Sequence, residues 1–303
     1  MIGVINVLKP PGMTSSDVVV FLRRELKIKK VGHTGTLDPE AAGVLPICLG
    51  KATRIADYIM EGDKVYHCHM KLGVTTDTSD LSGNIISQDN AIPPLEKIKE
   101  ALKVFQGEQN QIPPMYSAIK INGKKLYELA REGIEVERKP RKVLITENRF
   151  LSFGPPDVVK FEIICSKGTY IRSLCRDIGD WLGCGGAMQH LIRRASGRFS
   201  LESSNTLEEV LAARDDGSIS SMIIPMEDAL KSVIPSIVLK EGCKERVRHG
   251  NQVGESNIIV IEDADTNSNK FYSIFCGDTF MGIGYISIDR NKQKTVRMKS
   301  VLM

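Results

Sequence analysis

The densest group of side chains that can do chemistry lies in Gly32–Pro39, which has the sequence GHTGTLDP. Two glycines allow a tight backbone around His33, two threonines and Asp38. Asp38 precedes a proline, which favours an extended or turn geometry for the aspartate. A carboxylate presented by such a loop is suited to act as a nucleophile or a base. An Asx turn, in which the aspartate binds only nearby backbone, accounts for the same pattern.

A second cluster has the sequence CSKGTYIR and covers residues 165–172, where a strand is expected to end and a helix to begin. Tyr170 and Arg172 then fall in the first helical turn. An arginine at that place can pair with a carboxylate from another segment and favour its charged form. The alternative is a surface arginine beside a tyrosine that packs in the core.

Further candidates lie in a predicted strand around Tyr66, for which aromatic packing in the sheet is the simpler interpretation. His67 and His69 share one face of this strand, but no third ligand has a spacing typical of zinc sites. The sequence also contains no P-loop, no GxGxxG between a strand and a helix, no GxSxG and no HExxH. We therefore expect neither a metal nor a cofactor.

Length and composition indicate an ordinary globular protein with about two domains: 303 residues, 42% hydrophobic and 26% charged. No apolar run is long enough to span a membrane, and the first residues do not resemble a signal peptide. Seven cysteines form an odd set without a CxxC pair, which favours reduced thiols in the cytoplasm over a disulfide framework.

The net charge of +4 is mild, but its distribution is uneven. Residues 112–142, here called the arm, hold eight basic and four acidic side chains, and 8 − 4 equals the excess of the whole chain. The arm is therefore a candidate basic surface for an anionic partner. A solvated helix face is the alternative.

Hydrophobic patterns predict strands and helices in a mixed order. Strands are expected at 2–8, 44–49, 63–73, 143–153 and 157–165, with an Asn-Gly hairpin at 119–127 and a polar loop at 75–83. Helices are expected at 17–27 after Ser15 or Ser16, and at 51–60, 93–105, 126–132, 169–182 and 205–214. Short β-rich runs follow Pro235, so we expect domains at 1–234 and 235–303.

Several segments together resemble the TruB-type bacterial tRNA pseudouridine synthases, in the same order and over nearly the whole chain. They are KPPGMTS (9–15), GHTGTLDPEAAGVLPICLGKATR (32–54), KVYHCHMKLGVTTDTSDLSG (64–83), IPPMYSAIKINGKKLYELAREG (112–133), CSKGTYIRSLCRDIG (165–179) and LIRRASGRF (191–199). RVRHGNQV (246–253) and FMGIGYISI (280–288) resemble a PUA RNA-binding domain. The resemblance implies an α+β fold with a mixed, mainly antiparallel sheet flanked by helices, and a small C-terminal β-barrel-like domain.

The resemblance also implies an activity, in which uridine 55 in the T loop of tRNA is flipped out and isomerised to pseudouridine without a cofactor. Asp38 is the implied essential aspartate, Arg172 its partner, and Tyr66 the stacking platform and a candidate proton acceptor. The other implied roles are substrate contacts for His33, Tyr170 and Leu191, a structural role for Lys9 and Pro10, and RNA contacts for Lys64, Lys120, Lys124, Arg131, Arg141 and Arg193. Attack at C1′ and attack on the uracil ring both remain open.

Two other functions remain open at this stage. The first is a guide-RNA-dependent rRNA pseudouridine synthase, although such enzymes lack the inserted arm. The second is a non-enzymatic RNA chaperone or binding module, which the presence of Asp38, Tyr66 and Arg172 disfavours. We expect the T arm of tRNA as partner, no membrane association, a monomer and a cytoplasmic location.

Overall fold

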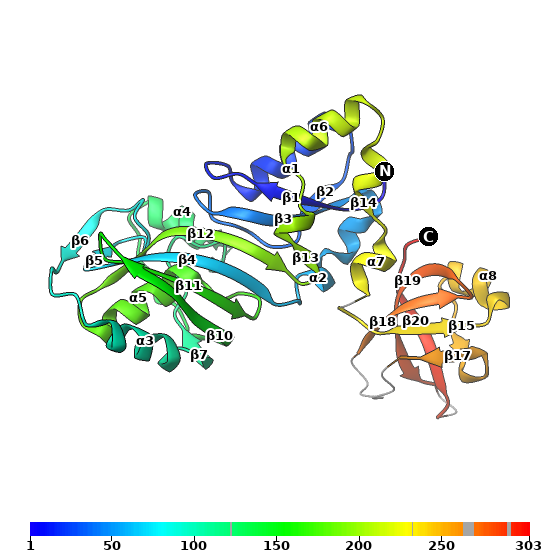
Figure 1. Cartoon of the computed structure of the whole chain (residues 1–303). Helices are drawn as coiled ribbons and strands as arrows, with labels where there is room; N and C mark the ends of the chain where they lie inside the picture. Colours follow the sequence, from blue (N-terminus) through cyan, green and yellow to red (C-terminus); the bar gives the residue numbers. More distant parts are fainter. Residues whose placement is uncertain (122, 232, 263–269, 290–291) are drawn as a thin grey trace.

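A computed structural model covers the whole chain, and the structure describes residues 1–121, 123–231, 233–262, 270–289 and 292–303. Figure 1 shows one large sheet that extends across most of the molecule and a second sheet at the C-terminal end. The large sheet positions the candidate site, because the segments that carry Asp38, Tyr66 and Arg172 all adjoin its central strands.

The large sheet has the strand order β14-β1-β3-β12-β4-β11-β10-β7, with β2 beside β3 and β13 beside β12. Its pairs are antiparallel except for β12 and β3, which run parallel over two residue pairs. The expected mixed, mainly antiparallel sheet is thus confirmed. The bounds are β1 Gly3–Lys9, β2 Val31–His33, β3 Ala42–Leu49, β4 Lys64–Leu72, β7 Gly107–Gln111, β10 Arg141–Gly154, β11 Val158–Cys165, β12 Gly186–Ser196, β13 Phe199–Ser200 and β14 Ile223–Ile224.

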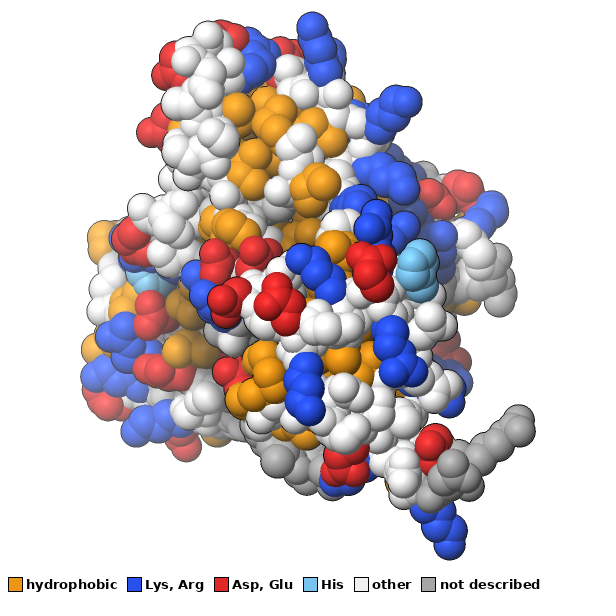
Figure 2. All heavy atoms as spheres, turned by 90° about the vertical axis from the view of Figure 1, so that its right-hand side faces the viewer, with side chains coloured by type: hydrophobic (Ala, Val, Ile, Leu, Met, Phe, Trp, Pro, Cys, Tyr) orange, Lys and Arg blue, Asp and Glu red, His pale blue; other side chains and the backbone are white. Residues whose placement is uncertain are grey.

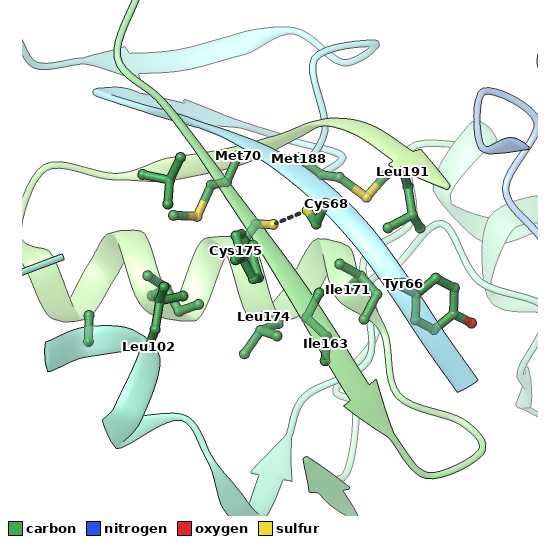
Figure 3. Packing of buried hydrophobic residues seen from close by; sticks show 14 of the residues in the cluster. Tyr66, Cys68, Met70, Leu102, Ile163, Ile171, Leu174, Cys175, Met188 and Leu191 are labelled. Atoms are coloured by element: carbon green, nitrogen blue, oxygen red, sulfur yellow. Dashed lines mark hydrogen bonds between the residues drawn. The ribbon is translucent and has the colours of Figure 1, made fainter. Parts of the chain in front are cut away.

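Helices flank this sheet and bury its apolar positions. Along β4 every second residue is buried, so Tyr66, Cys68 and Met70 face a core formed with two helices (Figure 3). The bounds are α1 Ser15–Glu25, α2 Ala56–Ile59, α3 Leu95–Val104, α4 Leu126–Arg131, α5 Ile171–Leu182, α6 Leu207–Asp215, α7 Met226–Leu230 and α8 Lys244–Arg248. Helices α3 and α5 contribute to the core behind β4, whereas α1 and α6 pack on β1 and β3.

Two helical expectations need correction. Helix α1 is capped by Thr14, which forms a capping box with Asp17, rather than by Ser15 or Ser16. The helix expected at 51–60 is a 3₁₀ helix over Gly50–Ile55 followed by the short α2. Both differences concern the ends and tightness of helices, which sequence patterns define poorly.

Two small hairpins extend from the sheet. One pairs β5 Val74–Thr76 with β6 Ile85–Gln88 and includes the expected polar loop. The other pairs β8 Lys120–Ile121 with β9 Lys124–Lys125, as the Asn-Gly signal predicted, although Asn122 itself lies outside the described residues.

The second sheet has the order β16-β20-β19-β18-β15-β17 and begins just after the expected boundary. Its bounds are β15 Ser236–Leu239, β16 Val253–Gly254, β17 Ile258–Ile261, β18 Phe271–Cys276, β19 Thr279–Ile288 and β20 Lys294–Val301. Phe280, Ile283 and Leu302 share one hydrophobic cluster with residues of β1 and α7. The C-terminal sheet therefore packs on the rest of the chain through a continuous core.

The parallel contact between β3 and β12 is unusually close. Gly43 pairs with Arg193 across it and has φ +117°, and a Cβ atom at Gly43 would lie 2.3 Å from the Arg193 carbonyl oxygen. Only glycine fits at this position.

We predict that Gly43→Ala lowers the free energy of unfolding by at least about 3 kcal/mol, because it adds a backbone clash to an unfavourable φ. Gly217→Ala is the matched control, since Gly217 has φ +81° but nothing within 4 Å of its Cβ position. The control should lose only about 1 kcal/mol. Urea unfolding of both variants tests the prediction, and equal losses would contradict it.

Candidate active site

The centre of the site is a two-point ion pair between Arg172, near the start of α5, and Asp38, in the loop before β3. The Arg172 Nε lies 2.9 Å from Asp38 Oδ2, and Nη2 lies 3.0 Å from Oδ1. The arginine side chain is 5% exposed and the aspartate side chain 33% exposed. A buried fork therefore fixes a carboxylate that solvent can still reach, and the predicted pairing is confirmed.

Arg172 also joins two further segments that sequence reasoning missed. Its Nη1 donates to the carbonyl of Thr78 at 3.3 Å, and its Nη2 donates to the carbonyl of Tyr116 in the arm at 2.7 Å. Asp80 adds a second carboxylate, 3.7 Å from Nε. Backbone carbonyls leave no residue-type signal, but the polar run TTDTSDLSG around Asp80 was a signal that could have been used.

The start of α5 is itself held by the strand that precedes the arm. The Gln111 side chain accepts a hydrogen bond from the Tyr170 N–H and donates one to the Tyr170 carbonyl, at 2.7 and 3.0 Å. Ser173 donates to the carbonyl of Ile112 at 2.9 Å. These contacts connect the base of the arm to the helix turn that carries Arg172.

The loop that carries Asp38, residues 34–41, is fastened to the N-terminal motif. Lys9 donates to the carbonyls of Pro10 and Pro39 at 2.8 and 2.9 Å, and Ser15 Oγ accepts a hydrogen bond from Leu37 N–H at 2.8 Å. Lys9 is completely buried, and burial lowers its pKa to about 8. These contacts support the structural role predicted for Lys9 and Pro10.

Tyr66 and Leu191 lie beside this loop at one end of the main core. Both belong to the same buried cluster as Leu37, and Figure 3 shows the Tyr66 hydroxyl directed away from the sulfur-rich centre of that cluster. Burial raises the pKa of the Tyr66 phenol, and the nearby Arg193 guanidinium opposes this shift. The phenol is thus a polar group at the edge of an apolar wall.

Tyr170 and His33 complete the group of predicted substrate contacts. Tyr170 is the residue before α5, and burial raises the pKa of its phenol while the charges of Arg141 and Arg172 oppose that shift. His33 ends β2, and its Nδ1 lies 3.3 Å from the Gly35 N–H. Burial, together with the charge of Arg193, lowers the pKa of His33, which favours the neutral imidazole.

The predicted RNA-binding residues divide into two groups. Lys120, Lys124, Arg131 and Arg141 are exposed on or beside the arm, where a phosphate can reach them. Lys64 and Arg193 are buried, with 6% and 1% exposure, and bind backbone carbonyls instead. The structure thus gives Lys64 and Arg193 backbone partners inside the protein, and RNA binding by these two residues stays a prediction.

The histidine pair on β4 has other partners. His67 Nε2 lies 2.8 Å from Glu162 Oε2, and the His69 ring packs edge-on against His190. Among the described residues, no group of three or more His, Cys, Asp or Glu side chains could hold a metal ion. In the same part of the chain, no helix is long and apolar enough to cross a membrane.

Comparison with known families decides what this geometry belongs to. Residues 23–171 match the TruB family pseudouridylate synthase N-terminal domain, and residues 172–231 match the tRNA pseudouridylate synthase B C-terminal domain. A protein from Alkaliphilus oremlandii named tRNA pseudouridine synthase B is 43% identical over 100% of this chain and 99% of its own length. The chain belongs to the TruB family. A relative of the same name from Clostridium acetobutylicum is 45% identical over 95% of this chain and 96% of its own.

The structure of this chain is also similar to solved structures of Cbf5 pseudouridine synthases. The Cbf5 chain of a Cbf5-Nop10-Gar1 complex matches with a TM-score of 0.79 at 30% identity, over 100% of this chain and 85% of that one. A chain from an H/ACA RNP bound to a substrate RNA containing 2′-deoxyuridine matches with 0.78 at 28% identity, with the same coverage. The similarity extends over both sheets.

The burial of Lys64 yields a prediction about stability and pH. Burial lowers the pKa of Lys64 to about 8, from an ordinary value of 10.5, so between these values the unfolded chain binds more protons. The contribution of Lys64 to folding stability must therefore increase as pH rises through this window. The difference in unfolding free energy between the wild type and Lys64→Met should shift by about 2 kcal/mol in favour of the wild type from about pH 7 to about pH 9.5. Urea titrations at both pH values measure it, and a pH-independent difference would contradict it.

Proposed function

We propose that this chain isomerises uridine 55 in the T loop of tRNA to pseudouridine, with Asp38 as the essential carboxylate. The observation that carries the proposal is the Asp38–Arg172 pair, in which a partly exposed carboxylate is held by a buried guanidinium. Relatives that match nearly the full length at 43–45% identity are named tRNA pseudouridine synthase B. A tRNA substrate therefore fits better than any other RNA.

The proposed reaction is balanced without a cofactor. The bond between N1 of uracil and C1′ breaks, a bond between C5 and C1′ forms, and the C5 proton leaves while N1 gains one. Asp38 takes part as a nucleophile, either at C1′ or on the ring. Arg172 keeps this carboxylate oriented by two hydrogen bonds.

Access to both N1–C1′ and C5 requires the uridine to leave its stack. A flipped base must be received by an aromatic or apolar surface, and extrusion costs a few kcal/mol. We assign the stacking surface to Tyr66, with Leu191 and Tyr170 as the adjoining wall and His33 at the rim. The clustering of Tyr66, Leu191 and Leu37 in one apolar group beside Asp38 supports this assignment.

We assign tRNA docking to the arm and to the C-terminal domain. We propose that this domain, residues 235–303, is a PUA-like RNA-binding module. Lys120, Lys124, Arg131 and Arg141 supply exposed positive charge for phosphates. Figure 2 shows Lys and Arg side chains gathered where the C-terminal domain meets the rest of the chain. Lys51 and Arg54 lie at this junction, since they donate to the carbonyls of Met303 and Val301. We propose a monomer that acts on tRNA in the cytoplasm.

A guide-RNA-dependent activity is the second candidate, because the solved neighbours include chains of H/ACA particles. The chain is only 28–30% identical to these neighbours and covers 85–86% of them. A guide-free assay separates the two activities. Incubation of the purified protein with an unmodified T-arm stem-loop should yield pseudouridine, and product that forms only with added guide RNA would favour the second candidate.

The role of Asp38 leads to a first functional prediction. Asp38→Asn keeps the shape of the side chain but removes its charge and basicity, so turnover should fall below about one hundredth of wild type. The dissociation constant for tRNA should change only a few-fold, since the docking surfaces are intact. Pseudouridine mapping and filter binding measure the two quantities, and substantial turnover with deamidation excluded would contradict the assignment.

The exposed lysines of the arm lead to a second functional prediction, which concerns tRNA binding. Each phosphate contact contributes a slope of about −0.7 to −0.9 in log K against log salt, so Lys120→Gln/Lys124→Gln should flatten the slope for tRNA by about 1.4 to 1.8. Turnover at saturating tRNA should change less than affinity. Lys97→Gln/Lys103→Gln is the matched control, because these two lysines are exposed on α3, away from the arm. An equal change in both double variants would show that the arm has no special part in docking.

A further inference from the structure

Two buried lysines, Lys9 and Lys64, lie near the buried guanidinium of Arg193. Lys9, Arg193 and Lys64 have 0%, 1% and 6% exposure. Burial lowers the pKa values of both lysines, and the charge of Arg193 adds to this effect. Within the described ranges, none of the three forms an ion pair with a carboxylate, and all bind backbone carbonyls. Burial of unpaired cations is costly, so their retention here needs an explanation.

Arg193 lies at the centre of this group and holds both ends of the segment that carries Asp38. Its Nε donates to the Val44 carbonyl at 2.7 Å, on the strand after the loop. Its Nη2 donates to the Gly35 carbonyl at 3.1 Å, and Nη1 approaches the Thr36 carbonyl at 3.4 Å, two residues before Asp38. The close approach of the Arg193 backbone to Gly43 fixes the position from which this fork extends.

The same guanidinium also faces Tyr66. Arg193 on β12 and Tyr66 on β4 are cross-strand partners, and both side chains are on the buried side of the sheet. The phenol interacts with the guanidinium, whose charge favours a negative phenol oxygen and so opposes the effect of burial on the pKa of Tyr66. One buried cation therefore holds the loop that carries Asp38 and adjoins the phenol of Tyr66, the candidate proton acceptor.

We propose that Arg193 is a positioning residue that holds the Asp38 loop and stabilises Tyr66 as a phenolate, which then accepts the proton from C5. This inference rests on the proposed function. Tyr66 first releases its phenol proton to solvent. In the step concerned, the C5–H bond breaks, its electron pair restores the C5–C6 double bond, and the electrons of the C6–N1 double bond move to N1, which takes a proton from solvent. The C5 proton passes to the phenolate oxygen, so the phenol is regenerated. No oxidant or reductant is needed.

The role of Arg193 differs from that of a mere loop support in one measurable quantity, the isotope effect at C5. The substrates are T-arm stem-loops that carry either uridine or 5-deuterouridine at the target position, and single-turnover rates are compared. Arg193→Gln keeps hydrogen-bond donors but removes the charge, and should slow the reaction about 100-fold. Arg193→Lys keeps the charge but cannot reproduce the planar fork, and should slow it less. In both variants proton removal becomes rate-limiting, so the C5 isotope effect should rise above the wild-type value.

Lys9→Gln is the matched control, because Lys9 supports the Asp38 loop through Pro39 without adjoining Tyr66. It should slow the reaction without raising the isotope effect at C5. Circular dichroism and tRNA affinity establish which variants fold, and a wild-type isotope effect in either folded Arg193 variant would overturn the inference. If the wild type forms no pseudouridine, the proposed function itself fails; an active wild type with unchanged Arg193 variants refutes only this inference.

Discussion

The ion pair between Arg172 and Asp38 is the interaction on which the geometry of the site depends. The Arg172 guanidinium binds the Asp38 carboxylate at two points. It also donates to the carbonyls of Thr78 and Tyr116, which belong to two other segments of the chain. A planar group with several donors is needed to join three chain segments at one place. The Gln111 amide fixes the helix turn from which this side chain extends. The Asp38 carboxylate, the polar loop around Thr78 and the arm are thus held in one geometry.

A second constraint comes from below the loop. Strands β3 and β12 are the parallel pair of the large sheet, and Gly43 on β3 allows the backbone of Arg193 on β12 to come close. Two arginines therefore hold the Asp38 segment in different ways. Arg172 binds the Asp38 carboxylate, whereas Arg193 binds backbone carbonyls on both sides of Asp38. The main chain of the loop is fixed, yet one third of the Asp38 side chain stays exposed to solvent.

Local patterns predicted most of the strands and helices, because strands such as β4 and helices such as α5 repeat apolar and polar residues with clear periods. The pairing of Asp38 with Arg172 was predicted by the resemblance to the TruB family, not by these patterns. The central strand β12 was not predicted, since its sequence GAMQHLIRRAS mixes charged and apolar residues without a clean alternation. The burial of Lys64 and Arg193 was missed for a related reason. Lysine and arginine are rarely fully buried, and the carbonyls that satisfy them come from segments distant in sequence.

The most direct test of the account is the single-turnover rate of Arg172→Met on an unmodified T-arm stem-loop, measured with its dissociation constant. Arg176→Met is the matched control, because Arg176 lies one turn along α5 and pairs with Asp177 instead of Asp38. The account predicts that Arg172→Met loses about 100- to 1,000-fold in rate with little change in affinity, whereas the control stays within a few-fold of wild type. A folded Arg172→Met enzyme with the wild-type rate would contradict it.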